Sequence, residues 1–193
     1  MKILVLGSSG FVGKNLIKFS KNKKKLLTTS YKNDSNLKFD ITKDNIENLF
    51  KSKKIDRVLI LCAKSNPQEC KLKKKYCYDV NVKFTKKLID FFIKKNLYFI
   101  IFSSEYVYSG KSKNYNENSI AKTDMIYGKH KIQIDKYLKK KSYKNYSILR
   151  LSKIYGDEIN DATLFSKNLK EYIKGKKKFK IASDQFFSPL FIR

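Results

Sequence analysis

Three glycines, spaced three residues apart, follow the first apolar segment of the chain. Ile3–Leu6 reads as a β-strand, and an amphipathic helix is predicted to begin near Phe11. Around this junction lie Gly7, Gly10 and Gly13. In such a unit the first glycine allows a tight turn, the second lets a pyrophosphate approach the backbone, and the third permits close packing of helix on strand. The pattern predicts a dinucleotide site, with an ordinary glycine-rich turn as the alternative.

Beyond this unit, short apolar runs alternate with segments of helical periodicity. Several runs are continuously apolar, as expected of strands that are buried on both faces of a sheet. We predict strands at 3–6, 26–30, 37–39, 57–61, 98–103, 146–151 and 179–182. We predict helices at 11–21, 43–51, 76–95, 125–141 and 164–174. The alternation predicts an α/β fold with a doubly wound, mostly parallel sheet of the Rossmann type.

The formal net charge of +27 is by itself typical of proteins that bind nucleic acids or anionic surfaces. Of the 44 basic residues only three are arginines, so 41 are lysines. Proteins that read bases and phosphates specifically favour the rigid guanidinium group. We therefore predict a solvated, lysine-rich surface with no specific nucleic-acid site. Weak, salt-sensitive binding to polyanions is the alternative.

The cysteines and the apolar runs bear on whether the protein is cytoplasmic, secreted or bound to a membrane. Cys62, Cys70 and Cys77 lack the spacing of a metal site, so we expect reduced thiols and no bound metal. The longest apolar run, around 97–102, has the length of a strand rather than of a membrane span. Met1 leads directly into the first strand, so no signal peptide is expected. Together these features predict a cytoplasmic protein without membrane contact.

Tyr127 and Lys131 form a Tyr-x-x-x-Lys motif on one face of a predicted helix. Because a nearby ammonium favours the phenolate, we expect Lys131 to lower the pKa of Tyr127 and to suit it for proton exchange near neutral pH. His130 lies on another face of the helix, and no role is expected for it. In a lysine-rich chain the motif also arises by chance, so a surface tyrosine is the alternative.

Several further segments occur in the order found in the extended short-chain dehydrogenase/reductase family, which the chain resembles over nearly its whole length. They are residues 39–42, the turn of small residues 61–63, Asn81, residues 99–108 and residues 149–156. In the family, the residue at the position of Asp40 faces the adenine amine, and the residue at the position of Ser104 carries the catalytic hydroxyl. A helix cap is the alternative for Asp40. The resemblance implies a cofactor site formed by Gly7, Ser9, Gly10, Phe11, Val12, Gly13, Ser30, Lys32, Asp40, Ile41, Cys62, Ala63, Lys64, Asn81, Tyr127 and Lys131.

The end of the second predicted strand bears on the choice of dinucleotide. NAD-selective Rossmann proteins usually carry a carboxylate there, which bonds the ribose hydroxyls. Here the strand ends at Ser30, and no carboxylate follows before Asp34. Ser30 and Lys32 are predicted to accommodate a 2′-phosphate. We therefore predict a preference for NADP(H) and leave the use of NAD(H) open.

Within the family, residues 104–108 resemble the dTDP-4-dehydrorhamnose reductases, in which an acidic residue, here Glu105, follows the catalytic hydroxyl. Residues 184–189 resemble the Asp-Gln-x-x-Ser-Pro-Thr segment of the same group. The chain departs from the group at Thr123, where a proline is expected, and at Leu190, where a threonine is expected. The resemblance implies hydride transfer from NAD(P)H to a 4-keto nucleotide sugar.

The same resemblance implies a role for each catalytic candidate. Tyr127 would protonate the developing alkoxide, and Lys131 would hold the nicotinamide ribose. Ser104 would hydrogen-bond the carbonyl oxygen, and Glu105 would orient the substrate or relay protons.

Family members continue beyond the segment at which this sequence ends. The resemblance therefore implies a Rossmann domain over 1–160 and the start of a substrate-binding lobe over 161–193, which is expected to be incomplete. The expected partner is a nucleotide-sugar substrate, and a homodimer is left open. Two alternatives remain: an epimerase or dehydratase of the same family, and a non-catalytic NAD(P)-binding regulatory subunit like that of methionine adenosyltransferase.

Overall fold

The computed structural model describes residues 1–31, 36–51, 53–112, 114–158, 161, 163–175, 178 and 188–192. Six strands form one sheet in the order β3-β2-β1-β4-β5-β6, and every neighbouring pair is parallel. The strands are β1 (Ile3–Leu6), β2 (Leu26–Ser30), β3 (Leu37–Lys38), β4 (Arg57–Ile60), β5 (Tyr98–Ser104) and β6 (Tyr146–Leu151). The predicted doubly wound sheet is confirmed. Its strand order reverses between β1 and β4, where sheets of this kind open a crevice at their carboxyl ends.

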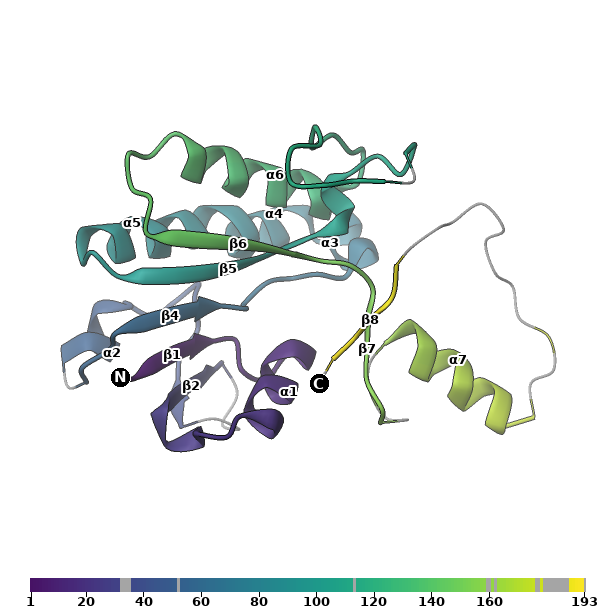
Figure 1. Ribbon diagram of the computed structural model, residues 1–193, viewed down its shortest axis with the longest axis horizontal. Coiled ribbons are helices and arrows are strands. Elements are labelled where there is room, and N and C mark those ends of the chain that lie inside the picture. The colour runs from purple at the N-terminus through teal and green to yellow at the C-terminus, as the bar shows by residue number, and fades with distance from the viewer. Residues whose placement is uncertain are drawn as a thin grey trace.

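Helices connect the strands. The α-helices are α1 (Phe11–Phe19), α2 (Glu47–Lys51), α3 (Pro67–Leu72), α4 (Lys74–Tyr78), α5 (Thr85–Lys94), α6 (Ile126–Lys139) and α7 (Leu164–Ile173). The described residues also form the 3₁₀-helices η1 (Lys23–Lys25) and η3 (Glu105–Val107), the π-helix η2 (Asp79–Phe84) and the short strands β7 (Ile154–Tyr155) and β8 (Leu190–Phe191). Figure 1 shows β7, β8 and α7 beyond the carboxyl ends of the six-stranded sheet. None of the helices that the structure describes is both long and apolar enough to cross a membrane.

The core lies between the central strands and α5. Leu4 and Leu6 of β1 and Val58 of β4 are completely buried, as the continuous apolar runs predict. On α5, Leu88 and Phe92 lie four residues apart, on one face of the helix, and are buried against this layer. This packing fixes the carboxyl ends of the strands, where the candidate site lies.

Two predicted helices differ from the structure, the first of them because polar side chains bind the backbone locally. The predicted helix 43–51 begins only at Glu47. Before it, Asp40 Oδ1 accepts the Thr42 N–H at 2.8 Å, and Asn45 Oδ1 accepts the Glu47 N–H at 2.9 Å. The predicted helix 76–95 is divided among α4, η2 and α5.

One helix, α3, was not predicted, although its first turn carries the usual signals. Asn66 Oδ1 accepts the Glu69 N–H at 3.0 Å, and Pro67 occupies the first helical turn. The predicted strand 179–182 lies outside the described residues.

Candidate functional site

A cleft of about 310 Å³ opens at the carboxyl ends of β1, β2 and β4, a volume typical of small-molecule sites. Of the predicted cofactor residues, it is lined by Gly7, Ser9, Gly10, Ser30, Asp40, Ile41, Cys62, Ala63 and Lys64. The predicted residues Phe11, Val12, Gly13, Asn81, Tyr127 and Lys131 do not line it. Lys32 lies outside the described residues. The structure therefore brings together most of the predicted set, from four separate turns.

The glycines of the first turn serve two different purposes. Gly7 has a φ of 85°, and a Cβ there would lie 2.6 Å from the backbone nitrogen of Cys62, so packing of the protein itself excludes a side chain. Gly10 has an ordinary φ of −72°, and an added Cβ would meet nothing nearer than the Gly7 carbonyl oxygen at 3.5 Å. Since Gly10 lines the cleft at the start of α1, its missing side chain leaves room for a ligand at the helix N-terminus.

Polar side chains at the ends of β2 and β3 complete the rim. The Ser30 hydroxyl donates to Ser9 Oγ at 3.0 Å. Asp40 Oδ1 also accepts the Thr42 hydroxyl at 2.6 Å. Burial raises the pKa of Asp40. The hydrogen bonds from the Thr42 side chain and backbone lower it by more than burial raises it, so the net shift is downward. Asp40 thus stabilises a turn, and not the start of a helix as the alternative interpretation expects, and it presents an ionised carboxylate on the cleft lining.

Asn81 holds the backbone of Lys64, one of the residues that line the cleft. From η2 its Oδ1 accepts the Lys64 N–H at 2.7 Å, and its Nδ2 donates to the Lys64 carbonyl at 2.9 Å. The same Nδ2 lies 3.3 Å from Nδ1 of His130, a side chain that is 5% exposed. Burial and then the nearby Lys131 lower the pKa of His130, which favours a neutral ring whose Nδ1 accepts this bond. His130, to which sequence reasoning gave no role, therefore helps to fix the turn after β4.

Tyr127 and Lys131 lie on α6, and both are buried, at 6% and 7% exposure. Burial excludes the alternative of a surface tyrosine. The Lys131 ammonium donates to the Phe102 carbonyl at 2.7 Å and lies 5.5 Å from the centre of the Tyr127 ring. Burial lowers the pKa of Lys131 to about 8, against an upward effect of Cys62. Because Cys62 lines the cleft, Lys131 connects the helix motif to the cleft wall.

The expected lowering of the Tyr127 pKa is wrong for this structure. Burial raises that pKa, and the neighbouring Cys70 and Tyr106 raise it further. The physical reason is orientation, since the ammonium of Lys131 is directed at the Phe102 carbonyl while the phenol lies among groups that favour its neutral form. A phenol that remains protonated is suited to donating a proton rather than to acting as a phenolate base.

Ser104 and Glu105 follow directly at the end of β5. Ser104 Oγ accepts the Tyr106 N–H at 3.3 Å, and the Tyr106 ring packs edge-to-face on Tyr127 with centroids 6.2 Å apart. Burial raises the pKa of Glu105, partly offset by Lys153. Lys153 also donates from Nζ to the Tyr106 hydroxyl. The structure thus connects Ser104 to Tyr127 through Tyr106, a residue that sequence reasoning did not single out.

Gly128 explains how closely these segments approach. A Cβ at Gly128 would lie 2.0 Å from the Tyr106 carbonyl oxygen and 2.6 Å from Cγ2 of Thr123. The first turn of α6 therefore packs directly on the backbone of η3, which holds Tyr127 against the end of β5. Thr123, found where the family resemblance leads one to expect a proline, accepts the Met125 N–H on its hydroxyl at 3.2 Å, just before α6.

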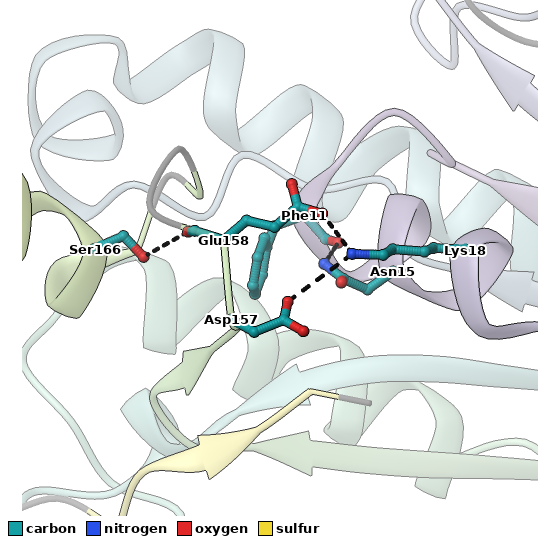
Figure 2. Close-up of polar contacts among 6 residues, drawn as sticks. All are labelled: Phe11, Asn15, Lys18, Asp157, Glu158 and Ser166. Carbon is teal, nitrogen blue, oxygen red and sulfur yellow. Dashed lines mark hydrogen bonds and ion pairs between the residues drawn. The ribbon is translucent and has the colours of Figure 1, made fainter.

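The segment after β6 docks against α1. Figure 2 shows Lys18 of α1 pointing toward Asp157 and Glu158, with the Lys18–Asp157 ion pair at 3.9 Å. The Glu158 carbonyl accepts the Ser166 hydroxyl at 3.3 Å, which joins α7 to the same contact. Of the predicted segment 184–189, only Ser188 and Pro189 lie among the described residues.

A family model described as the RmlD substrate binding domain matches residues 1–192. The chain belongs to this family. A curated dTDP-4-dehydrorhamnose reductase of Aggregatibacter actinomycetemcomitans is 26% identical over 98% of this chain. A solved structure of a dTDP-4-dehydrorhamnose reductase from Clostridium acetobutylicum is 25% identical in sequence, with a TM-score of 0.82. The match covers 100% of this chain and 66% of that reductase. The predicted resemblance to this group of reductases is confirmed.

Other solved structures share the fold at lower identity. A dTDP-4-dehydrorhamnose reductase from Bacillus anthracis, in complex with NADP, is 21% identical, with a TM-score of 0.83 over all of this chain and 67% of its own. A UDP-glucose 4-epimerase from Thermotoga maritima is 16% identical, with a TM-score of 0.83 over all of this chain and 70% of its own. This chain spans 63% of the length of the curated relative.

Proposed function

We propose that this chain forms the cofactor-binding and catalytic part of an NAD(P)H-dependent reductase of 4-keto nucleotide sugars. The observation that carries the proposal is the junction of two features. A glycine-lined cleft lies at the switch point of the sheet, and Cys62 in its lining acts electrostatically on Lys131, which is buried with Tyr127 on α6. Membership of the RmlD family and the relation to dTDP-4-dehydrorhamnose reductases support the reaction class.

The residues of the cleft fit a dinucleotide. Gly10 leaves the N-terminus of α1 open to a pyrophosphate, and the turn after β4 contributes the small residue Ala63 to the cleft lining. A reduced nicotinamide would supply the hydride when it is bound. One structural neighbour is a complex with NADP and another, MoeE5, a complex with NAD, which supports a nicotinamide cofactor of either kind.

The roles of the side chains follow from their surroundings. Tyr127 donates its phenolic proton to the substrate oxygen as that oxygen gains negative charge, and burial keeps the proton in place until then. Lys131, held by the Phe102 carbonyl, binds the ribose beside the nicotinamide and stabilises the charge that develops. Ser104 hydrogen-bonds the same substrate oxygen, and Glu105 contacts the sugar. The pair Ser104 and Tyr127 thereby orients the carbonyl for reduction.

The proposed cofactor preference is for NADPH. β2 ends at Ser30, which lines the cleft and pairs with Ser9 instead of presenting a carboxylate. A carboxylate at this position would favour the unphosphorylated ribose of NADH and repel a 2′-phosphate. NADH is expected to bind equally or more weakly.

The test has two parts and uses the complete gene product. Titration followed by nicotinamide fluorescence measures the binding of NADPH and NADH, and loss of NADPH absorbance with a dTDP-4-keto-6-deoxy sugar measures turnover. We expect binding of NADPH and substrate-dependent oxidation. Failure to bind either nucleotide would overturn the proposal. Binding without oxidation by any 4-keto nucleotide sugar would instead identify a regulatory, non-catalytic protein.

A further inference from the structure

Lys64 is anchored at its backbone and lines the cleft. Asn81 holds both the N–H and the carbonyl of Lys64, and Asn81 itself is 2% exposed. The Lys64 side chain then extends along the cleft lining. The start of the side chain is therefore held in place by a buried polar network, while the ammonium at its end can still change partners.

The ammonium lies between two aromatic rings that come from different sides of the cleft. It is 5.6 Å from the ring centre of Tyr31, the residue directly after β2, and 5.1 Å from that of Tyr76 on α4. Burial works to lower the pKa of Lys64, but the hydrogen bond to Tyr76 and the charges of Tyr76, Glu69 and Tyr31 together outweigh it, and the pKa is raised. Lys64 is thus a cation placed beside the carboxyl end of β2, the position at which Rossmann proteins distinguish the two adenosine riboses.

Two cations, Lys14 and Lys64, and one acid line the described part of the cleft, and Glu69 acts on Lys64 from outside this lining. Among the described residues that line the cleft, Asp40 is the one acid, and its Oδ1 already accepts two hydrogen bonds from Thr42. Lys14 of α1 lines the same cleft, at the glycine turn end. A doubly charged phosphate near Tyr31 would meet Lys64 and no carboxylate from β2.

We propose that Lys64 is the residue by which this cleft selects the 2′-phosphate of NADPH over the free ribose hydroxyl of NADH. The inference rests on the proposed function. An ammonium is a good point-charge partner for phosphate oxygens, and charge-assisted hydrogen bonds to them are stronger than contacts with tyrosine rings. Lys64 can therefore exchange the rings of Tyr31 and Tyr76 for the phosphate while its backbone remains fixed by Asn81.

The experiment compares the Kd values of NADPH and NADH for the wild type and for Lys64→Gln, measured by nicotinamide fluorescence. Calorimetric titration with adenosine 2′,5′-bisphosphate and with AMP repeats the comparison without the nicotinamide. We expect Lys64→Gln to weaken NADPH and the bisphosphate by about ten- to hundredfold and to leave NADH and AMP within about twofold. Lys64→Arg, which retains the charge, should recover most of the loss.

Lys14→Gln is the matched control, because it removes a cation from the same cleft. It should weaken both nucleotides by a similar factor and leave their ratio unchanged. If Lys64→Gln weakens both nucleotides equally, or neither, Lys64 does not select the phosphate, although the proposed function would stand. A wild-type protein that binds neither nucleotide overturns the function and this inference together.

Discussion

The cleft and the Tyr127–Lys131 pair are linked by the effect of Cys62 on Lys131, but they are built in different ways. The cleft is formed largely by backbone turns, and Gly10 at its edge is exposed. The pair consists of two buried side chains whose pKa values are both displaced by burial. If the proposed function holds, dinucleotide binding should depend on room beside the backbone, whereas proton transfer should depend on the surroundings of side chains. Substitutions should therefore separate affinity from turnover.

The largest effect is expected from Tyr127→Phe. Phenylalanine keeps the ring packed against Tyr106 and Cys70 but removes the proton donor. We expect the turnover number to fall by about 10²- to 10⁴-fold, and the Kd of NADPH to stay within about twofold, because the hydroxyl acts on the substrate oxygen. Steady-state kinetics and fluorescence titration measure the two quantities. Full activity of this variant would remove the catalytic assignment.

The complementary change is Gly10→Val. Its backbone angles are ordinary, and an added Cβ has space, so the variant should fold normally while its side chain projects into the cleft. We expect NADPH affinity to fall by at least about a hundredfold, since the contacts of the pyrophosphate with the amides of α1 are lost. Circular dichroism confirms the fold, and Lys38→Ala, on the exposed end of β3, is a neutral control. Unchanged affinity would show that the pyrophosphate does not lie at Gly10.

A smaller effect, on stability, is expected from Lys131→Met. The pKa of Lys131 is about 8 in the folded chain and 10.5 ordinarily, so folding works against its charge. Below pH 8 the folded protein carries this cost in full. Between pH 8 and 10.5 the unfolded chain binds more protons, so the free energy of unfolding of the wild type rises with pH. Methionine removes the charge and keeps the volume.

We therefore expect Lys131→Met to be more stable than the wild type by about 1–2 kcal/mol at pH 7, after the loss of the bond to Phe102 is allowed for. The advantage should shrink as the pH rises through 8 toward 10. Urea unfolding of both proteins at pH 7 and pH 9.5 measures it, and the other lysines cancel in the difference. A variant that is less stable by the same amount at both pH values would contradict this account.

The smallest effect is expected outside both regions, at Lys18. Its ion pairs with Asp157 and Glu158 involve side chains that are about half exposed, and such pairs contribute little to stability. Lys18→Met should change the midpoint of thermal unfolding by less than about 2 °C and leave NADPH affinity unaltered. Differential scanning calorimetry at low and high salt is the measurement. A large loss of affinity would mean that docking of the segment after β6 controls the cleft.

The regular parts of the fold could be predicted from the sequence because local pattern and tertiary packing agree there. The strand 146–151 was predicted with the bounds that the structure has, and the glycine turn was placed correctly between β1 and α1. The late start of α2 at Glu47 depends on hydrogen bonds from Asp40 and Asn45, which periodicity does not record. The capping signal of Asn66 was present in the sequence and was overlooked.

The candidate site was predictable as a set of residues but not as a set of environments. The Tyr-x-x-x-Lys spacing identified Tyr127 and Lys131, yet the direction of the Tyr127 pKa shift depends on Cys70 and Tyr106, which come from other segments. His130 was passed over because a helical wheel does not show that Asn81 faces it across the core. Contacts of this kind between distant segments follow only from the assembled fold.

The π-helix η2 has a consequence for how this chain tolerates changes in length. A π-turn contains one residue more than the α-turn that it replaces, so η2 is equivalent to a single-residue insertion between α4 and α5. The Thr85 hydroxyl donates to the Val80 carbonyl at 2.8 Å and so satisfies an acceptor within the widened turn. Deleting one residue here would give a regular helix but rotate one side of it by about 100° relative to the other. Asn81 would then no longer face the backbone of Lys64. The irregular turn therefore determines which helix residue contacts the lining of the cleft.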